Sequence, residues 1–251
     1  MKMLNKPYYR VFRPFLNPNK YVSPEHYEYL EDKRNCNNKS ELIRIYKIIY
    51  NEFLNILNYI EPINENFDTY SLKNYHLLCQ VCMEIENNFK GMLKTHDNNG
   101  ENIKDYFKLN KHLKLNEYSV SFLINNNNII LTPFLSWNTA NYSDYSKLSW
   151  YQSYNYVKHN RSIYFKEASL KNILDSLSAL YILLHAQFGS FSEVITSKNM
   201  ASLATGDGIY FISDSLFSIS NSPNWEDEEK YDFNWTDLKN DESPFNKLII
   251  S

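Results

Sequence analysis

Apolar residues recur every three or four positions along two stretches in the first half of the chain, which is the spacing of one face of an α-helix. The first stretch opens at Ser40 and Glu41 and ends before Pro62, with apolar positions at Leu42, Ile45, Ile49, Phe53, Ile56 and Ile60. The second covers about residues 69–94, with apolar positions at Leu72, Tyr75, Leu78, Cys82, Ile85, Phe89 and Met92. We therefore predict two long helices, followed by a shorter helix over residues 103–113.

The apolar spacing then changes to every second residue, which is the spacing of a β-strand. The alternating positions are Val120, Phe122, Ile124, Ile129 and Leu131, with four consecutive asparagines in the middle. We predict a β-hairpin over residues 118–134, because asparagine tolerates the positive φ of a tight turn and Pro133 closes the second strand. The segment GIYFIS at residues 208–213 is predicted to form another short strand.

Two more helices are predicted after the hairpin, one over about residues 146–163 and one from about residue 168 to Phe188. The apolar residues of the last helix cover more than one of its faces, so we expect it at the centre of a bundle. These residues are Leu170, Ile173, Leu174, Leu177, Leu180, Tyr181 and Leu184.

The patterns together predict a mainly α fold, an antiparallel helical bundle with an inserted β-hairpin and irregular terminal segments. Residues 1–38 form an irregular, aromatic N-terminal segment broken by Pro7, Pro14, Pro18 and Pro24. Residues 39–190 form the helical bundle, with the hairpin near 118–134. Residues 191–251 form a C-terminal extension with an acidic tail, in which residues 224–242 carry eight acidic and two basic side chains.

Composition narrows the functional classes. The net charge of −3, from 26 basic and 29 acidic side chains, creates no global field for nucleic acid, so such contacts require a local patch. Neither a signal peptide nor an apolar run of about 18 residues is present, and three cysteines suit a reducing compartment. We therefore expect a soluble cytoplasmic protein with no membrane association. Its five glycines and the lack of a P-loop, G-x-S-x-G or H-E-x-x-H predict no cofactor.

Cys79 and Cys82 form a C-x-x-C pair within the second predicted helix, and His76 lies one turn before it. A zinc site requires about four ligands, and no second C-x-x-C or close histidine pair follows. Both cysteines lie on or beside the apolar face, where a free cysteine behaves as a small apolar residue. We interpret them as core residues and expect no metal.

The stretch WYQSYNYVKHNR, at residues 150–161, concentrates chemistry in a chain otherwise short of reactive groups. On a helix, Asn155 lies one turn from both Lys158 and His159. His159 suits proton transfer near neutral pH, Lys158 and Arg161 suit phosphate binding, and Asn155 suits orientation of the reacting groups. An inward stripe is expected at Trp150, Tyr154, Val157 and Arg161. The alternative is an ordinary solvated helix surface.

Glu86 lies at the margin of the apolar face of the second helix, where an unpaired carboxylate is costly to bury. We hypothesise that Glu86, together with Glu84, faces Lys158, His159 and Arg161. The alternative is an exposed helix pair between Glu86 and Lys90.

The pattern Y-N-x-V-K-H-x-R, which follows a helix with E-x-E-x-x-x-K and precedes a long apolar helix, resembles the HEPN superfamily. That family consists of all-α domains of bacterial phage-defence and toxin–antitoxin systems, and its hallmark is Arg followed by His, often with Asn directly after the Arg. Asn155 and His159 match this Asn and His, whereas Tyr154 stands in the place of the Arg. The resemblance implies a metal-independent endoribonuclease whose composite site forms in a homodimer, with RNA as substrate and a protein antitoxin or defence-complex partner.

Three interpretations remain open from the residues. The first is this RNase, with catalytic His159, Asn155, Arg161 and Lys158 supported by Glu86 and Tyr154. The second is a catalytically inactive helical module that binds a protein or nucleic acid through its cationic face. The third is a polar network that only stabilises the packing of the helices.

Overall fold

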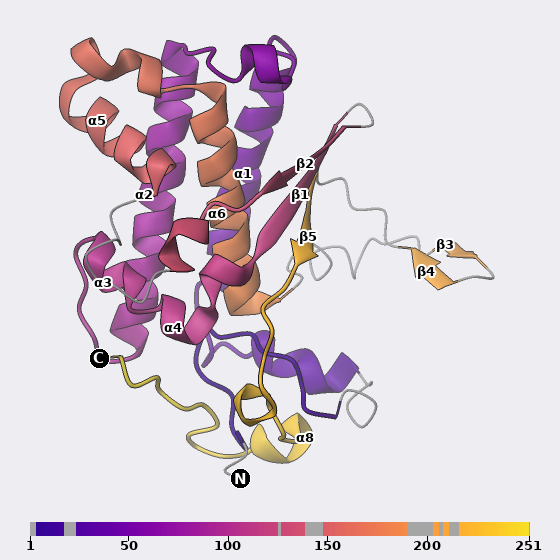
Figure 1. The fold of residues 1–251 in the computed structure, drawn as a ribbon. Coiled ribbons are helices and arrows are strands. Elements are labelled where there is room, and N and C mark those ends of the chain that lie inside the picture. Colours follow the sequence, from indigo (N-terminus) through magenta and orange to yellow (C-terminus); the bar gives the residue numbers. More distant parts are fainter. Residues whose placement is uncertain are drawn as a thin grey trace.

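Four long helices form the framework of the described part of the chain, which comprises residues 4–17, 24–124, 127–138, 148–189, 203–205, 208–210 and 216–250 of a computed structural model. They are α1 (Lys39–Leu57), α2 (Leu72–Thr95), α5 (Ser149–Tyr164) and α6 (Leu170–Phe188) (Figure 1). Short α-helices are α3 (Ile103–Phe107), α4 (Asn110–Leu113) and α8 (Trp235–Leu238). The 3-10 segments are η2 (Pro24–Leu30), η3 (Asn64–Asn66), η4 (Leu115–Glu117), η5 (Leu135–Asn138), η7 (Phe165–Glu167) and η8 (Asp227–Glu229). The fold is mainly helical, as predicted.

Helices α1 and α2 follow the two predicted apolar stretches. α2 begins where the Ser71 hydroxyl accepts a hydrogen bond from the Asn74 backbone N–H at 3.0 Å, an N-cap. Its apolar face is buried from Leu78 onward, whereas Leu72 in the first turn is 48 % exposed. α1 ends at Leu57, before the predicted Ile60, because the chain turns ahead of Pro62.

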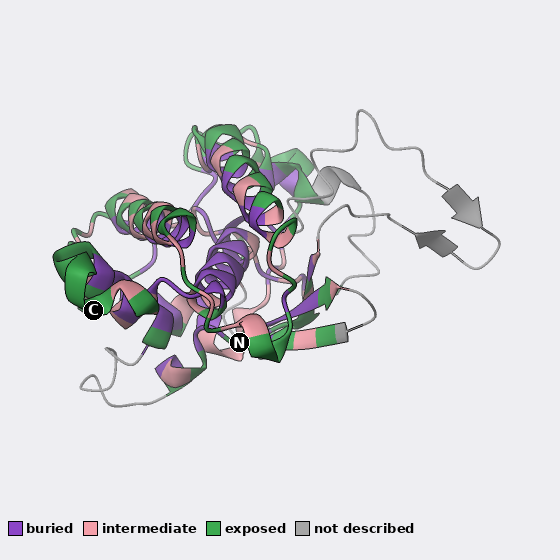
Figure 2. Cartoon of the chain, turned by 90° about the horizontal axis from the view of Figure 1, so that it is seen from above, coloured by how far each residue is buried: buried purple, intermediate pink, exposed green. Residues whose placement is uncertain are grey.

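Helix α6 is the most buried helix and contacts α1, α2 and α5, which agrees with its predicted central place. Figure 2 shows that buried residues gather between the helices and that their outward faces are exposed. α6 ends at Gly189, whose φ of +66° is left-handed, and a Cβ there would lie 3.2 Å from the Phe12 ring. The N-terminal segment therefore packs directly against the end of the central helix.

The prediction of one continuous helix over residues 103–113 is wrong. The chain forms α3 and α4 with a break between Phe107 and Asn110. Lys114, with φ +50° and ψ +41°, then ends α4 in the left-handed region.

A three-stranded antiparallel sheet covers one side of the helices (Figure 1). β1 (Ser119–Ile124) and β2 (Asn127–Leu131) form the predicted hairpin, with Phe122 opposite Ile129. β5 (Phe217–Asn221), which the sequence did not predict, pairs with the other edge of β1. β3 (Leu203–Thr205) pairs with β4 (Gly208–Tyr210), so the predicted strand is confirmed for residues 208–210, and residues 211–213 lie outside the described residues.

The N-terminal and C-terminal segments pack on each other at one end of the molecule (Figure 1). Tyr231 forms parallel bridges with both Leu4 and Phe15, and Tyr8 forms one with Asn246. Together the two segments enclose a second apolar cluster, made of Phe15, Tyr29, Leu30, Tyr231, Phe233, Trp235 and Phe245. Within the described residues, no helix is long and apolar enough to cross a membrane.

Candidate functional site

Helix α5 buries one side and exposes the other over its C-terminal half. Trp150, Tyr154 and Val157 are at most 1 % exposed, and the Trp150 indole N–H donates to the Pro133 carbonyl at 2.9 Å. Lys158 and His159 are exposed, and Asn155 is half-buried. The predicted inward stripe is therefore observed for its first three residues.

Tyr154, predicted from the sequence as a supporting site residue, is a core residue. It is 1 % exposed, and its hydroxyl has no hydrogen-bond partner among the described residues. Burial raises the pKa of the Tyr154 phenol, and the nearby Glu86 carboxylate raises it further. The side chain therefore stays neutral and brings no positive charge to the surface of α5.

Arg161 departs from the predicted inward stripe. Asn160 has φ −150° and ψ 73°, which breaks the helical path one residue before Arg161. Arg161 is exposed, and its guanidinium carbon lies 5.4 Å from the centroid of the Tyr75 ring and 6.0 Å from that of Phe165. Arg161 is thus a surface cation supported by aromatic rings rather than a core residue.

Two exposed rings lie on the same helix as these cations. Tyr156 and Tyr164 stack with their centroids 4.8 Å apart, and they are 46 % and 40 % exposed. No Asp or Glu occurs between Ser149 and Lys166 in the sequence. Among the described residues, no carboxylate lies within ion-pair distance of Lys158, His159 or Arg161. We call Tyr156, Lys158, His159, Arg161 and Tyr164 the α5 surface.

Glu86 binds the buried half of α5. The Tyr151 hydroxyl donates to Glu86 Oε1 at 2.9 Å, and Tyr151 is 9 % exposed. Neither of the partners considered from the sequence, the cationic cluster or Lys90, forms an ion pair with Glu86 in the described part of the chain. Tyr151 was not predicted as the partner of Glu86, because the expected partners were charged side chains and Tyr151 is neutral.

Glu84 lies toward α1 rather than α5. Burial raises the pKa of Glu84, the Asn87 amide opposes this shift, and the Glu41 carboxylate on α1 adds to it. The carboxylate is therefore not placed to balance the charge of Lys158 or Arg161.

The two cysteines of α2 differ in exposure. Cys82 is fully buried and Cys79 is half-buried, and both are free thiols. Burial raises the pKa of each thiol. Among the described residues, no group of three or more His, Cys, Asp or Glu side chains is placed to hold a metal.

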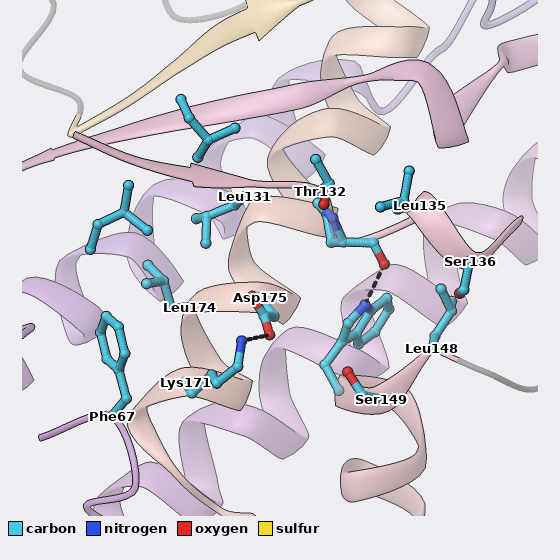
Figure 3. A pocket seen from close by; sticks show the side chains of 14 residues that line it. Phe67, Leu131, Thr132, Leu135, Ser136, Leu148, Ser149, Lys171, Leu174 and Asp175 are labelled. Atoms are coloured by element: carbon cyan, nitrogen blue, oxygen red, sulfur yellow. Dashed lines mark hydrogen bonds and ion pairs between the residues drawn. The ribbon is translucent and has the colours of Figure 1, made fainter. Parts of the chain in front are cut away.

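A cavity of about 480 Å³ lies at the other end of α5, between β2, η5 and α6 (Figure 3). Leu131, Leu148 and Leu174 line it, and so does the ion pair between Lys171 and Asp175 at 2.9 Å. Burial raises the pKa of Asp175, and Lys171 opposes this shift. None of the site residues predicted from the sequence lines this cavity.

Comparison with known proteins assigns no family: no protein-family model, curated protein or solved structure matches this chain. The function must therefore be argued from the α5 surface and its surroundings.

Proposed function

We propose that this chain is a HEPN-like helical module that binds single-stranded RNA through the α5 surface, and that its four long helices form an antiparallel bundle. One observation carries the proposal. Lys158, His159 and Arg161 are exposed with no carboxylate partner in the described residues, on a helix that also carries two exposed tyrosine rings.

The composition of the α5 surface suits RNA. Exposed lysine and arginine side chains that are not engaged by carboxylates are free to replace the counterions of phosphates. Tyr156 and Tyr164 offer ring faces on which unpaired bases can stack. Arg161 already lies over the rings of Tyr75 and Phe165, so its planar guanidinium is held close to the surface.

Binding is favoured over cleavage by the surroundings of His159. A general acid or base needs a second group that fixes its orientation and tautomer. His159 is exposed and has no hydrogen-bond partner among the described residues, and the arginine of the family motif is replaced by the buried Tyr154.

A nuclease remains the second candidate, because His159 and Lys158 are both exposed on one helix and a second protomer would bring a matching pair. In that case His159 would accept the proton of the RNA 2′-hydroxyl as its oxygen attacks the adjacent phosphorus. The P–O5′ bond would break, leaving a 2′,3′-cyclic phosphate and a 5′-hydroxyl that takes up a proton.

Binding is tested by fluorescence anisotropy with a labelled single-stranded RNA over a series of salt concentrations. Replacing both Lys158 and Arg161 by glutamine should weaken binding about tenfold and reduce the salt slope by about 1.4. The matched control is Arg44→Gln with Lys47→Gln, an exposed pair with the same spacing on α1. Equal affinities of the two double variants would refute the proposal.

Cleavage is tested by incubating the same RNA with the protein in EDTA. Cleavage by the wild type that is lost in His159→Ala would establish the nuclease. Binding without cleavage would leave the chain as a binding module. Sedimentation of the wild type with and without RNA shows whether a homodimer accompanies either activity.

A further inference from the structure

A second concentration of positive charge surrounds a cavity of about 380 Å³ that is separate from α5. The N-terminal segment, residues 33–38 before α1 and Thr95 at the end of α2 form its wall. Four of the lining residues are basic, and none is Asp or Glu. The basic residues are Arg10, Lys33, Arg34 and Lys247. Two of them form ion pairs with carboxylates outside the lining, Arg34 with Asp32 and Lys247 with Asp97. Arg10 and Lys33 have no such carboxylate among the described residues.

Arg10 is a buried cation without a counterion. It is 5 % exposed, and its guanidinium donates only to amides, to Gln187 Oε1 at 2.6 and 2.9 Å and to Asn88 Oδ1 at 3.4 Å. No carboxylate of the described residues lies within ion-pair distance of it. Burial lowers the pKa of Arg10, and the nearby Cys36, which also lines the cavity, opposes this shift. A buried charge held mainly by neutral dipoles is costly, which favours an anion in the adjoining cavity.

The backbone around Arg10 is shaped to hold the guanidinium there. Arg10 itself has φ +53°, in the left-handed region that residues with a Cβ rarely adopt. Its N–H donates to Asn35 Oδ1 at 2.7 Å. Gly91 on α2 provides the space, since a Cβ at that position would lie 2.7 Å from Arg10 Nη1.

Asn35 adds a donor that has no acceptor. It is 2 % exposed and lines the cavity, its Oδ1 is occupied by Arg10, and its buried Nδ2 has no partner among the described residues. Asn37 and Asn38, which precede α1, line the same cavity, and the Asn38 side chain does not cap the helix. The partial positive charge at the start of α1 therefore adds to that of the side chains.

We propose that this cavity binds a small molecule that carries a phosphate group. A phosphate accepts hydrogen bonds from several directions at once, which suits donors supplied by Arg10, Asn35 and the start of α1 better than a single carboxylate does. The volume falls in the range of about 300–1,000 Å³ that is typical of small-molecule sites. The cavity shares no residue with the α5 surface, so a negative result at one site does not contradict the proposal for the other.

Isothermal titration calorimetry at constant ionic strength tests this site with inorganic phosphate, adenosine 5′-monophosphate and adenosine. We expect both phosphate-bearing molecules to bind and adenosine not to bind. Tighter binding of the monophosphate than of inorganic phosphate would identify a phosphomonoester as the ligand class, and equal binding would identify free phosphate. Absence of heat with both at millimolar concentration would overturn the proposal.

Two variants locate the binding. Asn35→Asp keeps an acceptor for the Arg10 backbone N–H and places a negative charge in the lining, so we expect loss of phosphate binding. Lys33→Gln removes an exposed cation of the lining and should weaken binding at least about fivefold, whereas Lys47→Gln on α1 should change nothing. Phosphate binding that survives Asn35→Asp, or that disappears in Lys158→Gln, would overturn the proposal.

Discussion

The α5 surface and the cavity beside Arg10 are both cationic, but they keep their charge in different ways. On α5, Lys158 and Arg161 are exposed, and in the described part of the chain they lie over aromatic rings rather than beside carboxylates. In the cavity, Arg10 is withdrawn from water and held by two amides and a left-handed backbone. Exposed cations cost little to maintain and suit a mobile polymer, whereas a buried cation requires dedicated structure and suits a small ligand of fixed shape.

The largest effect is expected from breaking the support of Arg10. Gln187 is fully buried and accepts two hydrogen bonds from the guanidinium. Gln187→Leu leaves those donors unsatisfied beside a buried charge, so the free energy of unfolding should fall by about 3 kcal/mol in urea denaturation. Arg10→Met in the same background should restore most of this loss, because the buried charge is then gone. If Gln187→Leu is as stable as the wild type, Arg10 is not the costly cation described here.

An intermediate effect is expected from pH, through a histidine next to the cavity. His96 is 5 % exposed, and its Nδ1 accepts a hydrogen bond from the Leu248 N–H at 3.1 Å. Burial lowers the pKa of His96 from 6.5 to about 4, helped by His112, Arg10 and Lys247. Between pH 6.5 and pH 4 the unfolded chain binds a proton at His96 that the folded chain does not. The free energy of unfolding is therefore not reduced by His96 above about pH 6.5, and it falls as the pH is lowered toward 4.

Thermal unfolding between pH 7 and pH 5 measures this dependence. His96 should account for a loss of about 2 kcal/mol over that interval, so the profile of His96→Gln should be flatter than that of the wild type. His159→Gln is the control from the α5 surface, since His159 is exposed, and its profile should follow the wild type. Equal profiles for all three proteins would contradict the burial of a neutral His96.

The smallest expected change in stability distinguishes the buried side of α5 from its exposed side. Tyr151→Phe removes the hydroxyl that donates to Glu86 and should lower the free energy of unfolding by about 1 kcal/mol. Tyr156→Phe removes an exposed hydroxyl and should change it by less than about 0.5 kcal/mol. Chemical denaturation of both variants checks the difference, and a larger loss in Tyr156→Phe would reverse the assignment of buried and exposed sides.

Local periodicity accounts for most of the fold that was predicted. The helical spacing of α1, α2 and α6 and the alternation of the hairpin depend on neighbours in sequence, and these elements were found. Strand β5 was missed because five residues give little alternation, and its partner β1 lies about a hundred positions earlier in the chain. The break between α3 and α4 and the kink at Asn160 were also not predicted, because neither position has a proline or glycine.

The two candidate sites also differ in how far apart their residues lie in the sequence. The residues of the α5 surface are adjacent in sequence, so the motif could be recognised, although the exposure of Arg161 followed from the kink. The cavity is lined by residues such as Arg10, Asn35 and Thr95, which are far apart in the chain and of types that are common everywhere. The partners of the Arg10 guanidinium, Asn88 and Gln187, are equally far from it in the sequence. Only tertiary packing reveals that Arg10 is buried without a carboxylate.

The bridges that join Leu4 and Phe15 to Tyr231, and Tyr8 to Asn246, have a consequence for biosynthesis. A contact between residues 4–15 and residues 231–246 cannot form until the ribosome has made the later segment, and such long-range contacts slow folding. Helices α1 and α2 can assemble on the nascent chain, but the wall of the cavity that contains Lys247 cannot. The proposed phosphate binding should therefore appear only once the segment that contains Lys247 has left the ribosome.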